Sequence, residues 1–433
     1  MSPLRKIAFP TILIQFWVGI LALTALSAIY TITMTHLHHS PHPWGVQLLW
    51  GDDVGWDLEV FRDRFLLFGT PGFWQLRSIP LTYPATVGII FALLYKLADP
   101  LRDYLLLCAL GVAAWIAWLV RILAAQRVAR GPATIFALTI TATCWPLWVL
   151  FDTANIEGLV AILVGAGLLA VVHRRWGLAA TLIGIAGAMK IFPIILLALL
   201  LSKRRYREFV GGIAIALAAT LVSLAILGPS VPEAQRQINL GLRVVTTDDA
   251  LAATSPGPDT NHSLYTVVRY AVLLAHHRHP HQAPQPGRDA AMLRPAYFAY
   301  LILGALATVA AYVLRIRRLP MLNQILALAV CAVTLPTLSR DYTLLHLLVP
   351  FGLLCAYAAA QSPPARGLAA CFVCLAFLFT AETYFNFVYA LSSPFRALAL
   401  LVLFALLLTY PFHSTYLDAE DAEMDRPDVA AIV

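Results

Sequence analysis

The chain has 433 residues, of which 60% are hydrophobic and 12% charged, and its mean hydropathy is +0.77. Apolar stretches of about 20 residues, the length that spans a bilayer, recur along the chain and exclude a soluble globular protein. The net charge of +7 lies in short basic clusters at the ends of these stretches, which argues against nucleic-acid binding and for anionic lipid. We predict one all-α, polytopic transmembrane bundle, because a backbone exposed to lipid must satisfy its own hydrogen bonds.

The predicted membrane segments, about 11 to 13 in total, follow the apolar tracts along the chain. They are 7–34, 81–98, 104–124, 132–151, 155–172, 177–201, 209–228, 295–314, 321–338, 342–360, 367–391 and 395–412. Two long polar connections, 35–80 and 229–294, interrupt the single predicted domain, 1–413, and residues 414–433 form an acidic tail that we expect to be disordered and cytoplasmic. Basic residues at 5–6, 203–207 and 315–318 predict cytoplasmic ends, which places both long connections outside.

The first long connection carries the densest group of carboxylates in the chain. Asp52, Asp53, Asp57, Glu59 and Asp63 follow directly after the first apolar segment. A carboxylate near water can take a proton from an incoming hydroxyl, and neighbouring carboxylates raise one another's pKa. The pattern indicates an enzyme working at the membrane surface, and its alternative is an acidic loop that is merely solvated.

Lys190 interrupts an apolar tract three residues before Pro193. A lone lysine at the bilayer centre costs about 3 kcal/mol, so such a residue normally faces a cavity or a partner. We interpret it as a phosphate contact at a helix break, with snorkelling to a nearby interface as the alternative. If every segment spanned the membrane once, the basic residues at 173–175 would lie outside, against the positive-inside rule. A broken hairpin over 177–201, hinged near Lys190 and Pro193, would place them in the cytoplasm.

Further polar residues interrupt the late and middle apolar tracts. Arg340 and Asp341 are a second candidate for anion binding or an ordinary interfacial loop, and His346 is more often a satisfied bundle residue than a catalyst. His262, between Asn261 and Ser263, is placed to approach a sugar or phosphate, or to cap the next helix. Asp152, Asn155 and Glu157 are interpreted as a tight turn, with the wall of a cavity as the alternative. The six cysteines, all in apolar tracts, are interpreted as small buried hydrophobes.

These motifs occur in an order that resembles glycosyltransferase family 87 of the GT-C superfamily. The matching pieces are Asp57-Leu-Glu-Val-Phe, Leu81-Thr-Tyr-Pro, Ala188-Met-Lys-Ile-Phe-Pro, Asn261-His-Ser-Leu and Ser339-Arg-Asp-Tyr, the last leading to Pro350. They span residues 50 to 350. Ala85 replaces the second proline that is usual after Tyr83-Pro84, and the late histidine pair of some mannosyltransferase members is absent.

The resemblance implies an inverting transfer of a hexose, most commonly mannose, from a polyprenyl-phosphate donor to a glycolipid or glycan hydroxyl. It implies a multi-pass protein of the bacterial cytoplasmic membrane, with its active site outside, acting as a monomer without a metal or cofactor. The predicted site residues are Asp57 as base with Asp52 or Asp53 as fallback, Lys190 and Arg340 on the donor phosphate, and Glu59, Tyr83, His262, Asp341 and His346 on sugar or acceptor.

Other classes of membrane protein remain as alternatives. A transporter or lipid flippase would place ionisable residues near mid-membrane in two related halves, and the sequence has no visible internal repeat. A GT-C oligosaccharide ligase with a lipid-pyrophosphate donor would concentrate basic residues in a late outside loop. A non-catalytic scaffold would leave the costly Lys190 without a reason.

Overall fold

The computed structural model describes residues 9–38, 54–70, 72–75, 81–243, 261–277, 286–361, 363–381 and 392–414, together with Leu417. Within these ranges the chain is helical and contains no β-strand, so the predicted all-α class is confirmed. The α-helices are α1 (Thr11–His38), α2 (Trp56–Glu59), α3 (Arg62–Leu66), α4 (Gly72–Gln75), α5 (Ala85–Leu94), α6 (Pro100–Ala125), α7 (Arg130–Thr143), α8 (Trp145–Thr153), α9 (Glu157–Val172), α10 (Trp176–Met189), α11 (Ala198–Ser202), α12 (Tyr206–Leu227), α13 (Val231–Arg243), α14 (Leu264–Ala275), α15 (Pro286–Leu314), α16 (Met321–Thr334), α17 (Leu348–Ala360), α18 (Leu368–Phe379) and α19 (Ser392–Thr409). The 3₁₀ helices are η2 (Phe192–Leu197), η4 (Ile316–Arg318) and η5 (Asp341–Leu347).

The membrane-length helices in the described ranges are fewer than the predicted segments. Five continuous stretches are long and apolar enough to cross a membrane, and α7 with α8, bent by 54° between them, makes a sixth if the pair is one span. The other predicted segments form apolar helices of 10–17 residues. A 14-residue helix is about 21 Å long, shorter than the hydrocarbon core of about 30 Å. Full-length helices alone therefore do not reach the expected 11 to 13 crossings.

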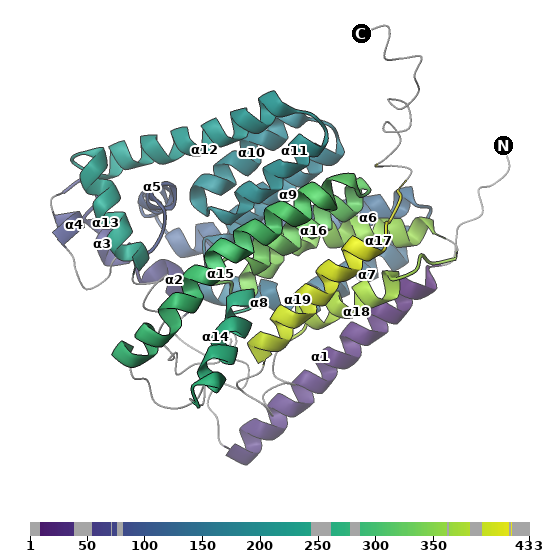
Figure 1. Cartoon of the computed structure of the whole chain (residues 1–433). Coiled ribbons are helices and arrows are strands. Elements are labelled where there is room, and N and C mark those ends of the chain that lie inside the picture. The colour runs from purple at the N-terminus through teal and green to yellow at the C-terminus, as the bar shows by residue number, and fades with distance from the viewer. Residues whose placement is uncertain are drawn as a thin grey trace, which may run out of the picture.

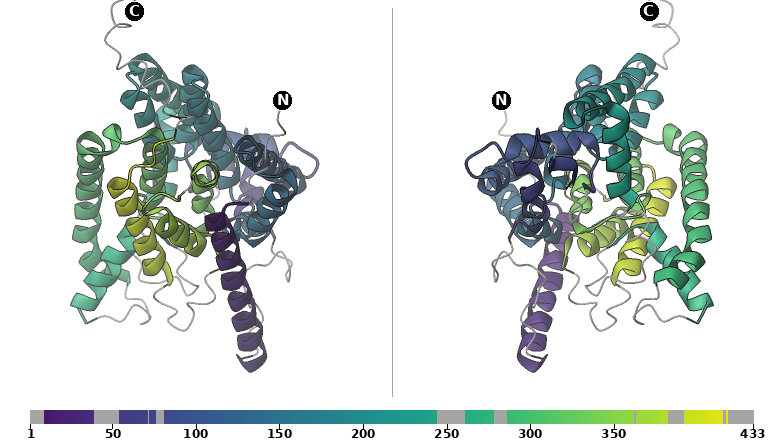
Figure 2. Two further views of the ribbon diagram at one scale, coloured as in Figure 1. Left: turned by 90° about the vertical axis from the view of Figure 1, so that its right-hand side faces the viewer. Right: turned by 90° about the vertical axis from the view of Figure 1, so that its left-hand side faces the viewer.

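The helices form a bundle with a buried centre and a lipid-facing periphery. Figure 1 shows α16 and α17 inside the bundle, with α1, α12 and α15 along its margins. In the most apolar 18 residues of the stretch 341–360, 94% of the residues are buried, whereas in those of the stretch 288–318, which is mostly α15, 6% are buried. Figure 2 shows α1 extending past the rest of the bundle at its C-terminal end. Apolar side chains that point away from the core here suit lipid as the solvent.

The segment after α9 is a broken hairpin, as predicted. α10 ends at Met189, and the extended backbone of its C-cap residue Lys190 (φ −143°, ψ 131°) leads into η2 and α11. Pro193 in the first turn of η2 lacks an N–H and cannot continue the preceding helix. The Arg205 guanidinium lies 5.5 Å from the centre of the Trp176 ring. Both ends of the hairpin therefore lie on one face of the protein, and Lys190 lies at its tip.

The two long connections contain helices of their own. The first holds α2, α3 and α4, and the second, predicted to be a polar loop to residue 294, holds α13, α14 and the first turns of α15. α13 packs against the segment before α5, where a Cβ on Gly241 would lie 2.0 Å from the Leu81 carbonyl oxygen. Only glycine permits this approach, which positions the backbone just before Tyr83.

Candidate active site

Asp57 lies in the first turn of α2, on a backbone that glycine makes possible. Gly55, which precedes α2, has a φ of +86° and donates its N–H to the Asp152 carbonyl at 2.8 Å. A side chain at Gly55 would be strained in this left-handed conformation and would meet Leu101 at 2.5 Å. The result is a fixed α2 that presents the half-buried Asp57 carboxylate toward the end of α8.

Asn155, in the turn between α8 and α9, uses all of its side chain to organise the site. Its Nδ2 donates to Asp57 Oδ2 at 2.8 Å and to the Tyr83 hydroxyl at 3.0 Å. Its Oδ1 accepts from the Glu157 backbone N–H at 2.9 Å, and its carbonyl accepts from the Tyr104 hydroxyl. The turn depends on Ala154 in the left-handed region, with a φ of 49°. Three distant segments are thereby held together by one amide.

A buried ionic cluster lies beside this amide. Glu157, fully buried at the N-terminus of α9, forms an ion pair with Lys190 and accepts from His346 Nε2 at 2.5 Å through its other oxygen. The Lys190 ammonium also lies 5.4 Å from the centre of the Tyr342 ring and 5.9 Å from that of Tyr83. A carboxylate at a helix N-terminus and a cation at a helix C-terminus are each favoured by the helix dipoles. The Lys190 side chain keeps 16% of its surface exposed, so the ammonium is not fully enclosed.

Tyr83 connects the carboxylate side of the site to its cationic side. Burial and the negative charge of Asp57 raise the pKa of Tyr83 well above its ordinary range, while the charge of Arg340 opposes that rise. Tyr83 therefore stays protonated at neutral pH. Arg340 is exposed just before η5, and its positive charge acts on Tyr83. The site thus combines one accessible carboxylate with two cations.

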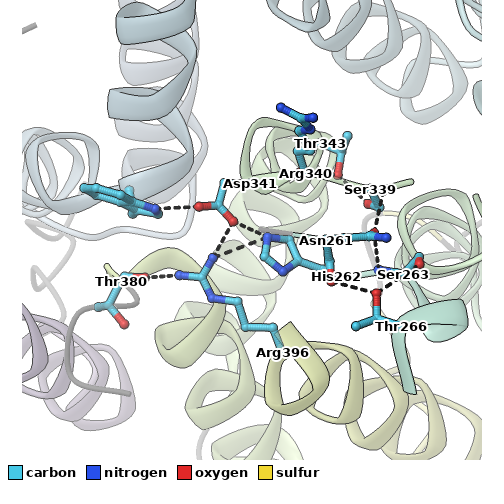
Figure 3. Close-up of polar contacts among 11 residues, drawn as sticks. Asn261, His262, Ser263, Thr266, Ser339, Arg340, Asp341, Thr343, Thr380 and Arg396 are labelled. Carbon is cyan, nitrogen blue, oxygen red and sulfur yellow. Dashed lines mark hydrogen bonds and ion pairs between the residues drawn. The ribbon is translucent and has the colours of Figure 1, made fainter. Parts of the chain in front are cut away.

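A second, closed cluster lies behind Arg340 (Figure 3). Asp341 is buried and accepts from the Trp145 indole at 2.7 Å and from Arg396 Nη1 at 2.6 Å, and it contacts His262. Arg396 also donates to the Thr380 carbonyl at 2.6 Å. Charge-assisted bonds to a buried carboxylate hold geometry firmly. The cluster joins η5 to α8, to the segment just before α14, and to α19.

The neighbouring backbone is fixed by another amide. Asn261 Oδ1 accepts from the backbone N–H groups of Ser263 and Ser339, and its Nδ2 donates to the Thr337 carbonyl. The Ser339 hydroxyl bonds that of Thr343 at 2.6 Å. Figure 3 shows the Arg340 side chain pointing away from this network and from the buried Asp341. The two motifs at 261–263 and 339–343, far apart in sequence, therefore form one support for Arg340.

The predicted site residues separate into three groups in the structure. Asn155 links Asp57 to Tyr83, the Lys190 ammonium lies against the Tyr83 ring, and His346 shares Glu157 with Lys190. Arg340 is exposed nearby and acts electrostatically on Tyr83. His262 and Asp341 are 0% and 1% exposed and form part of the closed cluster. Glu59 pairs instead with Arg62 at 3.4 Å and acts electrostatically on Tyr95. The fallback residues at 52 and 53 lie outside the described residues.

Other residues of the site were overlooked or interpreted otherwise from the sequence. Asn155 and Glu157 do border a turn, but their side chains bind Asp57 and Lys190, so the interpretation as a mere turn was wrong. The available signal was the cost of burying Glu157 in an apolar tract. Arg396 carries the same signal, as a single cation at the start of the last apolar helix.

An apolar groove lies next to the buried Glu157–His346 pair. It has a volume of about 210 Å³ and lies between α6, the α8–α9 region and the start of α17. Its lining includes Gly158 and Leu345, the neighbours of Glu157 and His346. A Cβ on Gly158 would lie 2.7 Å from the Cys108 sulfur, so glycine is needed for close packing here.

Among the described residues, no group of three His, Cys, Asp or Glu side chains is arranged to hold a metal ion.

Comparison with known proteins places this arrangement in a family. The sequence model of glycosyltransferase family 87 matches residues 81–339, more than half of the chain, and covers Tyr83, Asn155, Glu157, Lys190 and His262. Neither the comparison with curated proteins nor that with solved structures gave a match. The chain therefore belongs to glycosyltransferase family 87 and is a membrane-bound glycosyltransferase with several apolar helices.

Proposed function

We propose that this glycosyltransferase moves a hexose, most simply mannose, from a polyprenyl-phosphate donor to a hydroxyl of a lipid-linked or glycan acceptor. The observation that carries the proposal is that Asn155 joins the half-buried Asp57 to Tyr83, whose ring lies 5.9 Å from the Lys190 ammonium and feels the charge of Arg340. A base and a phosphate-binding pair are what such a transfer requires. The enzyme acts as a monomer without a metal or cofactor.

In the proposed step, the acceptor oxygen attacks the anomeric carbon and Asp57 takes its proton. The bond from the anomeric carbon to the phosphate oxygen breaks, and its electron pair leaves with the phosphate. The second pKa of a phosphate monoester is near 6, so this leaving group needs no general acid. Attack opposite to the departing phosphate inverts the anomeric configuration, which converts a β-linked donor into an α-linked product.

The cations stabilise the charge that develops on the leaving phosphate. Arg340 is exposed at the edge of the site, and Lys190 reaches it from the tip of the hairpin while paired with Glu157. His346 holds the second oxygen of Glu157 and thereby orients the pair. Asp341 and His262, enclosed behind Arg340, position η5 and act on the sugar only through it.

The apolar groove beside Gly158 suits the first isoprene units of the donor lipid. It starts at the residues next to Glu157 and His346, so a phosphate at Lys190 would place its lipid at the mouth of the groove. Ala161 lines this groove, and Ala218 on α12 is exposed on the lipid-facing side. We expect Ala161→Phe to raise the KM for the donor about tenfold, while Ala218→Phe leaves it within about twofold.

The basic turns at 174, 203–205 and 317–318 lie on one face, about 21 Å along α10 from Lys190. The positive-inside rule assigns that face to the cytoplasm of a bacterium, which supports an active site on the opposite, outer side of the membrane.

The direct test is sugar transfer in membranes containing the protein, with polyprenyl-phosphate mannose, glucose or arabinose as labelled donor and native lipid extract as acceptor. We expect Asp57→Asn to lower the rate by about 10²–10⁴-fold, the usual contribution of a general base. Asp63→Asn, an exposed carboxylate in α3, is the matched control and should stay within about twofold of wild type.

The outcomes separate the alternatives. Transfer that persists in Asp57→Asn moves the base to Asp52 or Asp53. If none of these donors is used but an added lipid-pyrophosphate oligosaccharide is, the enzyme is an oligosaccharide ligase. An α-linked product from a β-linked donor supports inversion, and retention of configuration would overturn the proposed step.

A further inference from the structure

A large basic cavity lies on the face opposite the active site. It has a volume of about 720 Å³, within the range of about 300–1,000 Å³ that is usual for ligand sites. Six of its lining residues are cationic: Arg174, Lys203, Arg204, Arg205, Arg317 and Arg318. None of the described residues that line it is acidic. A hollow lined by so many positive charges attracts anions.

The cavity is built by turns between helices rather than by one flexible loop. The end of α9, the start of α10, the α11–α12 turn, η4 and the start of α16 all contribute to its lining. Arg174 and Arg204 hold left-handed backbones, with φ values of 59° and 57°. Non-glycine residues in that region store strain, which clusters at functional sites. The Arg205 guanidinium is held over the Trp176 ring at 5.5 Å.

The rest of the lining is largely apolar, with Val171, Val172, Leu319 and Met321 beside the cations. Outside the cavity, the first turns of α12 present Tyr206 and Val210, 60% and 62% exposed, on the lipid-facing side. A phosphate surrounded by guanidinium groups and followed by acyl chains would meet both kinds of surface. A soluble phosphate would contact only the cationic surface.

We propose that this cavity binds the phosphate groups of an anionic phospholipid headgroup, separately from the sugar donor. Phosphate is the shared chemistry of such a headgroup and of soluble pyrophosphate, and the apolar lining favours the lipid. The site lies about 21 Å from Lys190 along α10, so one ligand does not reach both. Its occupant would fix the hairpin whose tip carries Lys190.

The test is native mass spectrometry of the full-length protein in neutral detergent, titrated with cardiolipin, phosphatidylglycerol, phosphatidylcholine or inorganic pyrophosphate. We expect retention of the anionic lipids, little phosphatidylcholine, and at least tenfold weaker retention of cardiolipin in Arg204→Gln/Arg318→Gln. Arg207→Gln, an exposed arginine on α12 outside the cavity lining, is the matched control and should change retention less than about twofold. Thermal unfolding of each variant shows that the fold is retained.

Several outcomes would overturn the proposal. Equal retention of phosphatidylcholine, an unchanged double variant, or the same loss in Arg207→Gln would remove the cavity as the site. Pyrophosphate that competes as well as lipid would assign the cavity to a soluble anion. The acidic residues from Asp418 onward follow Leu417, which lines the cavity. If lipid is retained only after Asp418 and Glu420 are neutralised, the cavity is occupied by the acidic C-terminal segment of the chain itself.

Discussion

Replacing Lys190 by methionine separates a structural role of this residue from a catalytic one. The change keeps the length of the side chain but leaves the Glu157 carboxylate, 0% exposed, without its cation. Removing one partner of a buried ion pair typically costs about 3–5 kcal/mol. His346 still donates to the other carboxylate oxygen at 2.5 Å, so we expect the lower end, about 3 kcal/mol. That cost is a factor on the order of 10² in the unfolding equilibrium.

The double variant Glu157→Gln/Lys190→Met removes both charges and should recover most of this loss, to within about 1 kcal/mol of wild type. Sugar transfer should not recover, because the cation that faces the donor phosphate is still absent. Equilibrium unfolding in mixed micelles and the transfer assay, run on the same preparations, measure the two effects. Lys96→Met, exposed after α5, is the control.

Two results would refute this reasoning. A fully stable Lys190→Met would mean that Glu157 does not depend on the pair. A double variant that is stable and transfers sugar at the wild-type rate would remove Lys190 from the phosphate site, and the role would fall to Arg340 alone.

Three further substitutions test the geometry around this cluster. Gly55→Ala should cost about 1–3 kcal/mol of stability and lower the transfer rate, because it displaces α2. Gly69→Ala is its control: Gly69 has a φ of +85° but open space around it, so the substitution should lower thermal stability and leave the transfer rate unchanged. Burial and a nearby carboxylate raise the pKa of Tyr83, so its phenol should not ionise near pH 10. Tyr83→Phe should therefore leave the alkaline limb of the pH–rate profile unchanged, and a shifted limb would contradict this. Trp145→Phe removes a donor to the buried Asp341 and should cost about 1–3 kcal/mol of unfolding free energy, while unchanged thermal unfolding would show that the cluster rearranges without loss.

Side-chain chemistry explains which parts of the site were predictable. Lys190 was found from the sequence because an ion in an apolar tract is costly wherever the chain folds, and the hairpin hinge at Pro193 followed from the missing N–H. Asp57 was selected by its position near water and by the family resemblance. Its catalytic role stays a prediction, as do the roles of Arg340 and Tyr83.

The remaining partners depend on contacts between segments far apart in the chain. Asn155 was interpreted as part of a turn because an amide beside a turn is ordinary. The neighbouring sequence carries no sign that its side chain bonds Asp57, 98 residues earlier. His262 and Asp341 were expected to face the sugar, but the inward direction of both side chains is set by Arg396 and Trp145 from other helices.

The apolar periodicity of the sequence by itself determined the class of this protein, a helical membrane bundle, since a backbone in lipid has few other ways to satisfy its hydrogen bonds. The ordered motifs determined the family. Only the tertiary structure decided which of the apolar tracts are continuous helices, which carboxylate pairs with Lys190, and that the basic turns meet around one cavity. Those properties arise from packing between distant segments, because ion pairs and cavities form between surfaces that a linear sequence does not place together.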